Sequence, residues 1–344
     1  MSHLHDVLQT YVGSGSVPGA VGLVARDDQA EVQAVGSADA DGTSPLARDS
    51  IFRIASITKP MTAAAAMMLV EDGQITLDDP VGPWLPELAS PAVVRTPAGP
   101  VDDVVPAARP ITVADLLTFR AGYGFPSDFS LPAVGPLVSE LKQGPPQPQL
   151  VAAPDEWIAT LARIPLLYQP GDAWLYNTCS DILSVLIARA AGRPLPEFLA
   201  ERLFEPLGMV DTGFEVPAGK LDRFTSYYRT GPAGDLELVD PPGGQWSSRP
   251  AFPSGADGLV STVDDWHRFA RMLLAGGSFG GSVDVEAIDP WNVPGRYGWV
   301  GGTGTAAHIT PSTGAVAILL SQLELTGPTP PALMRDFWRY AASA

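Results

Sequence analysis

Strand-like segments occupy both ends of the chain, and this distribution limits the folds that it can adopt. GAVGLVARDD and AEVQAVGSA, near the N-terminus, read as two strands, and RYGWVGG, TAAHIT and GAVAILLSQ, near the C-terminus, read as three more. Most helical patterns lie between these two groups. The simplest architecture therefore pairs the terminal strands in one antiparallel sheet, which the first and last helices cover, and inserts a mostly helical region in the middle.

This pattern predicts an α+β fold with two domains. Residues 1–60 and 255–344 would form the sheet domain and residues 61–254 the helical domain, with an active site between them. The dipeptide at 27–28, Asp-Asp, reads as the turn between the first two strands. Residues 124–154 contain seven prolines, so we expect a long surface loop there.

Composition excludes several classes of partner. The 344 residues carry a formal net charge of −17, which argues against nucleic acid and anionic membrane surfaces. No run of about twenty apolar residues is present, so we expect no transmembrane helix. The single cysteine, Cys179, cannot form an intrachain disulfide, and the first residues lack the pattern of a signal peptide. We therefore expect a cytoplasmic protein.

Ser56 and Lys59 are the first candidates for chemistry. The chain has three lysines against eighteen arginines, and lysine, unlike arginine, can lose its proton when buried. On a helix the two side chains would share one face, at a terminus whose unpaired N–H groups favour negative charge. The apolar run AAAAMMLV that follows predicts a buried helix. A serine cap beside a solvated lysine is the alternative interpretation.

Longer stretches resemble a known family. FRIASITKPMTAAAAMMLVEDGQITLDDPV resembles the signature of serine β-lactamase-like hydrolases, which include class C β-lactamases, DD-peptidases and family VIII carboxylesterases. ITVADLLTFRAG, PGDAWLYNTCSDILSVLIARAAG, GADGLVSTVDDWHRFARMLLAGG and YGWVGGTGTAAHITP resemble their later motifs, in the same order. The resemblance covers nearly the whole chain. It implies the β-lactamase/transpeptidase-like fold, an active-site serine, and neither a cofactor nor a metal.

The resemblance also implies roles for individual residues. Ser56 would be the nucleophile that forms an acyl-enzyme, and Lys59 would help to take its proton. Tyr176 would be the partner general base and acid, since a nearby ammonium favours a phenolate. The backbone N–H groups of Ser56 and Gly302 would form the oxyanion hole.

Two departures from the family pattern favour esters over β-lactams. The third motif is usually Lys-Thr-Gly, but Trp299, Val300 and Gly301 stand there, without a cation. Thr178 takes the place of the asparagine in the second motif. We expect Trp299, Gly301, Thr178 and also Tyr123, beside a glycine turn, to bind the substrate.

The leading interpretation is a serine carboxylesterase that acts on a small-molecule ester or other acyl donor. The alternative is an acyltransferase that passes the acyl group to an alcohol or amine of a small metabolite. A β-lactamase or DD-peptidase and a non-catalytic binding protein are weaker alternatives. No Gly-x-Ser-x-Gly motif is present, which disfavours an α/β-hydrolase. The sequence does not name the acyl group, the acceptor or the oligomeric state.

Overall fold

The structure is a computed structural model that describes residues 3–26, 29–276, 282–284, 286, 289, 291–327 and 329–343. The chain divides into two compact units. The first contains residues 1–58, 204–249 and 259–344, and the second contains residues 59–203 and 250–258. The expected turn at Asp27 and Asp28 lies outside the described residues.

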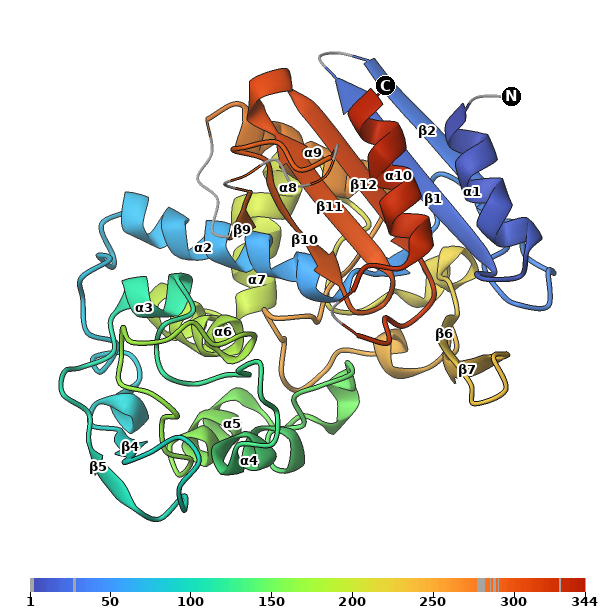
Figure 1. Cartoon of the computed structure of the whole chain (residues 1–344). Coiled ribbons are helices and arrows are strands. Elements are labelled where there is room, and N and C mark those ends of the chain that lie inside the picture. Colours follow the sequence, from blue (N-terminus) through green and yellow to red (C-terminus); the bar gives the residue numbers. More distant parts are fainter. Residues whose placement is uncertain are drawn as a thin grey trace. The chain divides into compact units, whose positions relative to one another are not determined.

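The first unit is built on a six-stranded sheet in the order β2-β1-β12-β11-β10-β9, in which every pair of neighbours is antiparallel (Figure 1). This arrangement confirms the prediction that the strands from the two ends of the sequence share one sheet. Its strands are β1 (Gly19–Arg26), β2 (Gln29–Gly36), β9 (Ser282–Val283), β10 (Tyr297–Gly301), β11 (Thr305–Thr310) and β12 (Ala315–Ser321).

Helices cover both faces of this sheet, as expected. On one face, α1 (His3–Gly13) and α10 (Ala332–Ser343) pack against each other and against the strands (Figure 1). Gly22 of β1 allows these two helices to pack close to the strand, because a Cβ there would lie only 3.2–3.4 Å from side-chain atoms of Leu4, Phe337 and Leu8. On the other face, α9 (Val263–Leu274) contacts β12 and β1.

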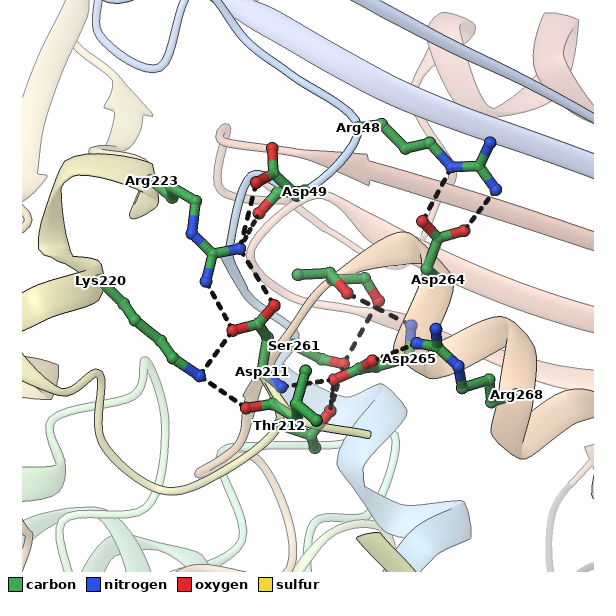
Figure 2. A network of polar contacts seen from close by, with 12 residues as sticks. Arg48, Asp49, Asp211, Thr212, Lys220, Arg223, Ser261, Asp264, Asp265 and Arg268 are labelled. Atoms are coloured by element: carbon green, nitrogen blue, oxygen red, sulfur yellow. Dashed lines mark hydrogen bonds and ion pairs between the residues drawn. The ribbon is translucent and has the colours of Figure 1, made fainter. Parts of the chain in front are cut away.

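Residues 204–249 pack in the first unit, whereas the sequence analysis placed them in the helical domain. Figure 2 shows the polar network that holds part of this segment. Asp211 accepts hydrogen bonds from Arg223 and Lys220, and its own backbone N–H donates to Asp265 on α9 at 2.7 Å. Arg223 also donates to Asp49. This segment carries α8 (Glu205–Leu207), η6 (Ala218–Arg223), β6 (Tyr227–Thr230), β7 (Leu236–Asp240) and η7 (Gln245–Ser247).

A buried arginine also joins this segment to the N-terminal part of the first unit. Arg53 lies on the two-residue strand β3 (Phe52–Arg53), which pairs with β8 (Val260–Ser261), and its side chain is 2% exposed. Its guanidinium donates two hydrogen bonds to the Asp240 carboxylate and others to the carbonyls of Thr225, Asp240 and Pro241. Its Cζ lies 4.0 Å from the ring centroid of Phe224. Burial lowers the pKa of Arg53 to about 10, and the charge of Asp240 opposes this effect.

Replacing Asp240 tests how much the buried ion pair with Arg53 contributes to stability. Asp240→Asn would leave the Arg53 charge buried without its counter-charge, so we expect the free energy of unfolding to fall by about 3–5 kcal/mol. Urea denaturation measures the loss. The control is Asp264→Asn, which breaks the partly exposed ion pair with Arg48 and should cost no more than about 1 kcal/mol. Equal losses in the two variants would show that Asp240 is no stronger an anchor than a surface charge.

The second unit is mostly helical, and its centre is α6 (Thr178–Ala191), ten of whose residues are buried. Helices α2, α3, α5 and α7 all contact it. The other helices and strands of this unit are α2 (Lys59–Glu71), η2 (Pro86–Leu88), β4 (Ala92–Val94), β5 (Val104–Pro106), α3 (Val113–Leu117), η3 (Pro132–Val134), α4 (Gly135–Ser139), η4 (Pro148–Leu150), α5 (Pro154–Leu161) and α7 (Leu195–Leu199). The π-helical turn η5 (Ala200–Phe204) follows α7.

The prediction of a surface loop over residues 124–154 is wrong in part. The segment contains η3, α4 and η4, and it buries Leu137, Leu141 and Gln143 in the second unit. Four of its seven prolines, Pro132, Pro136, Pro148 and Pro154, lie in the first turn of a helix, where a missing N–H costs nothing. Its most exposed large apolar residues are Phe129 and Leu150.

Candidate active site

Ser56 lies on a strained turn. The sequence predicted a helix from residue 56, but the structure has a 3₁₀ turn, η1 (Ala55–Thr58), before α2 begins at Lys59. Ala55 has a φ of +44°, in the left-handed region that residues with a Cβ seldom occupy. Strained backbone of this kind persists only where the surroundings hold it in place, and it concentrates at functional sites.

Two threonines hold the residues that lead into this turn. Thr303 donates its hydroxyl to the carbonyl of Arg53 at 2.6 Å, and Thr305 donates to the carbonyl of Ile54 at 2.9 Å. Both threonines are buried and follow strand β10. The end of β10 is therefore fixed beside the backbone that precedes Ser56.

The close approach of β10 to the backbone before Ser56 requires a glycine at position 301, the last residue of the strand. A Cβ at this position would lie 2.1 Å from Oγ1 of Thr305 and 2.5 Å from the carbonyl oxygen of Ile54. The next residue, Gly302, has open space around the same position. Trp299, two residues earlier on the strand, is half-buried. The structure therefore brings the strand that carries Trp299, Gly301 and Gly302 next to the turn that carries Ser56.

These adjacent glycines provide a matched pair of variants. Gly301→Ala should push β10 away from η1, and overpacking of this kind typically costs about 1–3 kcal/mol. Gly302→Ala should leave the free energy of unfolding within about 0.5 kcal/mol of the wild type. Thermal unfolding of both variants measures the difference. A Gly301→Ala protein as stable as Gly302→Ala would mean that β10 and η1 are not in close contact.

Lys59 and Tyr176 lie together in the second unit. Lys59 is 6% exposed, so the alternative of a solvated lysine is wrong. Its Nζ donates to the carbonyl of Ala256 at 2.8 Å and lies 4.7 Å from the ring centroid of Tyr176. A desolvated cation at this distance from an aromatic face is attracted to it. The structure thus brings together the two residues for which the sequence predicted proton transfer.

The backbone around Tyr176 is also strained. Tyr176 and Phe125 exchange both backbone hydrogen bonds at 2.9 Å. The next residue, Asn177, has φ +80° and ψ −67°, and the N–H of Thr178 donates to the carbonyl of Tyr176 at 3.2 Å. These values describe a γ-turn of the rare, strained kind. The strain and the bridge to Phe125 fix the tyrosine immediately before α6.

Two aromatic side chains pack beside the Tyr176 ring. The ring centroids of Trp174 and Phe119 lie 5.9 and 6.4 Å from that of Tyr176, and 6.0 Å from each other. Trp174 is 49% exposed. The proposed base therefore has an apolar, partly open surface next to it.

A buried polar cluster extends from Lys59. Asp181 on α6, 5% exposed, lies at hydrogen-bond distance from Ser254 Oγ (2.7 Å) and accepts hydrogen bonds from Gln143 Nε2 at 3.0 Å and from the N–H of Ala256 at 3.3 Å. Burial, followed by the charge of Asp257, raises the pKa of Asp181 to about 7. The sequence analysis did not identify Asp257, Ser254 or Gln143, because their contacts join segments far apart in the chain.

Three other residues that the sequence singled out near the site are buried. Thr178 is fully buried, and its hydroxyl donates to Oε1 of Gln143 at 2.6 Å. Tyr123 is 2% exposed, its hydroxyl has no hydrogen-bond partner among the described residues, and burial raises its pKa. Burial also raises the pKa of Cys179 to about 12, which disfavours the thiolate that a nucleophile needs. Substrate binding by Thr178 and Tyr123 stays a prediction.

The described part of the chain has neither a metal-binding cluster nor a membrane-spanning helix. It contains no group of three or more His, Cys, Asp or Glu side chains that could hold a metal ion. None of its helices is long and apolar enough to cross a membrane.

Known proteins resemble this chain in sequence and in fold. The profile of the family described as Beta-lactamase matches residues 4–336. Protein Rv1367c of Mycobacterium tuberculosis is 40% identical over 81% of this chain and 67% of its own length. Esterase EstB of Burkholderia gladioli is 31% identical over 76% of this chain and 67% of its own length. The solved structure of EstCE1, described as a hydrolase with promiscuous acyltransferase activity, superposes with a TM-score of 0.81 at 25% identity and covers 98% of this chain and 97% of that one.

These matches confirm the resemblance and the fold that the sequence analysis inferred. They also confirm its functional class, because the related proteins include esterases and acyltransferases. None of the matches assigns a role to an individual residue of this chain.

Proposed function

The chain belongs to the β-lactamase family, and on this premise we propose that it is a serine carboxylesterase that uses Ser56, Lys59 and Tyr176. The observation that carries the proposal is the buried Lys59 ammonium 4.7 Å from the Tyr176 ring, three residues after Ser56 on its strained turn. A cation so placed favours the phenolate, which can take the proton of the serine.

In the proposed first step, Ser56 Oγ attacks the carbonyl carbon of the ester and gives its proton to the Tyr176 phenolate. The carbonyl π-electrons move to the oxygen, and the backbone N–H groups of Ser56 and Gly302 bind this oxyanion. The tetrahedral intermediate then collapses and the C–O bond to the leaving alkoxide breaks. Tyr176 returns the proton to the alkoxide, which departs as an alcohol. Ser56 is left acylated.

In the second step, Tyr176 activates the acceptor. A water molecule gives its proton to the phenolate and attacks the acyl carbon, and Ser56 Oγ leaves with the proton from Tyr176. The acid is released and the enzyme is restored. In this proposal Lys59 supplies a positive charge beside the Tyr176 ring.

Trp299 supports an uncharged substrate. It lies on β10, two residues before Gly301, where related enzymes that bind β-lactams carry a lysine. An indole cannot pair with a carboxylate, but it can pack against an acyl chain. The net charge of −17 gives anionic substrates no long-range attraction. We therefore propose small neutral esters as the substrate class, and we keep the absence of nucleic-acid and membrane partners and the cytoplasmic location as predictions.

Covalent labelling tests the nucleophile. A p-nitrophenyl phosphonate should add its mass to the peptide that contains Ser56, and Ser56→Ala should abolish both labelling and ester turnover. Tyr176→Phe, which keeps the ring, should label far more slowly, since general acid–base groups contribute roughly 100- to 10,000-fold. Mass spectrometry of the digested protein locates the label. Labelling of a different serine, or full turnover by Ser56→Ala, would overturn the mechanism.

Substrate preference tests the role of Trp299. We expect a higher kcat/KM for p-nitrophenyl acetate or butyrate than for nitrocefin, measured in one buffer. Trp299→Lys should raise the turnover of nitrocefin relative to the esters, because it restores a cation for the β-lactam carboxylate. A wild-type preference for nitrocefin by tenfold or more would make the protein a β-lactamase.

Acyl transfer is the second candidate, and one observation favours it. EstCE1, whose fold this chain shares along its whole length, is described as a hydrolase with promiscuous acyltransferase activity. The apolar surface of Trp174 and Phe119 beside Tyr176 would suit an apolar acceptor. The two activities differ only in whether water or another nucleophile attacks the acyl-enzyme. Adding alcohols and amines to the ester assay and identifying the products by mass distinguishes them.

A further inference from the structure

A single serine hydroxyl bridges two carboxyl groups next to Lys59. Ser254 Oγ lies 2.7 Å from Oδ1 of Asp181 and 2.9 Å from Oδ1 of Asp257. Ala256, whose carbonyl accepts the hydrogen bond from Lys59 Nζ, lies between Ser254 and Asp257 in the chain. All of these residues belong to the second unit.

The protons at this bridge can be counted. A serine hydroxyl has one proton, so it can donate to only one of the two carboxyl oxygens. Its oxygen also accepts hydrogen bonds from the N–H groups of Asp257 and Ala256, both at 3.2 Å, and the Ala256 N–H is shared with Oδ1 of Asp181 at 3.3 Å. If both acids were ionised, one of these short oxygen–oxygen contacts would hold no proton and would be repulsive. The geometry is satisfied when one of the two carboxyl groups is protonated and donates to Ser254 Oγ.

We propose that Asp181 and Asp257 form a buried acid pair that shares one proton through Ser254 and so places a single negative charge beside Lys59. This inference rests on the proposed function, in which Lys59 acts as a cation. Asp181 is the protonated member and donates to Ser254 Oγ. Ser254 in turn donates to the Asp257 carboxylate. Both are positioning residues, because they act on Tyr176 only through Lys59.

Burial decides which acid keeps the proton. Asp181 is 5% exposed, whereas Asp257 is only partly buried, so ionising Asp181 costs more. Burial raises the pKa of both groups, and the charge of Asp257 raises that of Asp181 further, to about 7. After burial, the next influence on Asp257 is the Lys59 charge, which lowers its pKa. The Lys59 charge lowers the pKa of both acids, and for Asp257 it is the largest influence that opposes burial, so we assign the negative charge to Asp257.

The charges around the pair support this assignment. On α2 the charged neighbour is Lys59, and on the 250–258 segment it is Asp257. The other titratable groups on α6 and on the helices that contact it are paired with other residues, exposed to solvent, or uncharged. Arg189 pairs with Glu87 and Asp155, Asp115 of α3 pairs with Arg109, Glu156 and Glu197 are exposed, and Cys179 is a buried thiol.

The pair gives Lys59 a fixed counter-charge. One negative charge balances the positive charge of Lys59, whose Nζ lies 4.7 Å from the centroid of the Tyr176 ring. A second negative charge would outweigh the lysine and leave a net negative charge beside the tyrosine. The single shared proton thus sets the charge that the proposed base requires.

Asparagine substitutions should have unequal effects. Asp181→Asn resembles the protonated acid, since its amide can donate to Ser254 and accept from Gln143, so we expect kcat within about threefold of the wild type. Asp257→Asn removes the counter-charge of Lys59, and a charge at such distances is worth roughly 10- to 1000-fold in a protonation equilibrium. We therefore expect kcat to fall at least about tenfold and the midpoints of its pH profile to move.

If the two acids had a purely structural role, Asp181→Asn would lower kcat more than Asp257→Asn. Asp181 is the more deeply buried acid and takes part in three hydrogen bonds, so its replacement would then do more harm. Asp265→Asn is the matched control, because Asp265 is 1% exposed but belongs to the first unit and pairs with Arg268. It should leave the pH profile of kcat unchanged.

Infrared spectroscopy detects the shared proton without any assay of activity. The wild-type protein near pH 6 should show the carbonyl band of a protonated carboxylic acid, which Asp181→Asn should lack and Asp265→Asn should keep. Stability gives a second readout. Because the pKa of Asp181 is raised from 3.8 to about 7, its contribution is fully present below pH 4 and is lost as pH rises through 7. The wild type should therefore lose stability relative to Asp181→Asn across this range.

Failure of the inference differs from failure of the proposed function. A missing band, or equal losses of kcat in Asp181→Asn and Asp257→Asn, would overturn the shared proton while Ser56 labelling still supported the esterase. If Ser56→Ala kept full turnover, the proposed function would fall. The infrared result would still decide whether the pair holds a proton.

Discussion

The position of the proposed nucleophile depends on the buried guanidinium of Arg53. It satisfies three carbonyls and one carboxylate from residues 225–241, and it packs against Phe224 and Trp246. An arginine can do this because its planar group offers five donors in fixed directions, which a lysine cannot match. Its backbone carbonyl accepts the Thr303 hydrogen bond. One residue thus links the 204–249 segment, strand β3 and the end of β10, and Ser56 follows only three positions later.

These contacts help to explain how the chain tolerates backbone strain at Ala55 and Asn177, which are the neighbours of Ser56 and Tyr176. Ala55 precedes Ser56 and Asn177 follows Tyr176, and both have positive φ. Such conformations cost of order 1–3 kcal/mol each and relax unless their neighbours are held. Ala55 directly follows two residues whose carbonyls accept hydrogen bonds from threonines, and Asn177 lies between the bridge to Phe125 and the start of α6. The stabilising contacts are therefore adjacent to the strain that they maintain.

Local signals made much of the fold predictable from the sequence. Alternating apolar residues identified the strands, and the local sequence ITVAD provides the capping box of Thr112 and Asp115 that starts α3. The rarity of lysine drew attention to Lys59. Long-range contacts were not predictable: Gln143 bonds Asp181 from a proline-rich segment that read as a surface loop, and Ser254 bonds Asp181 across 73 residues of sequence. The periodicity of a sequence does not reveal such contacts. The hydrogen-bond partner of a buried polar residue can lie in a segment that is distant in the sequence.

The buried charges of the second unit explain why a lysine and a tyrosine would work together. A lone neutral lysine could serve as the base only if its surroundings disfavoured its charge. Here the surroundings include a carboxyl pair and the carbonyl of Ala256, all of which stabilise a cation. In the proposed mechanism the two residues therefore have different roles: Lys59 supplies a positive charge, and the phenol of Tyr176, whose ring centroid lies 4.7 Å from Nζ, accepts the proton of Ser56.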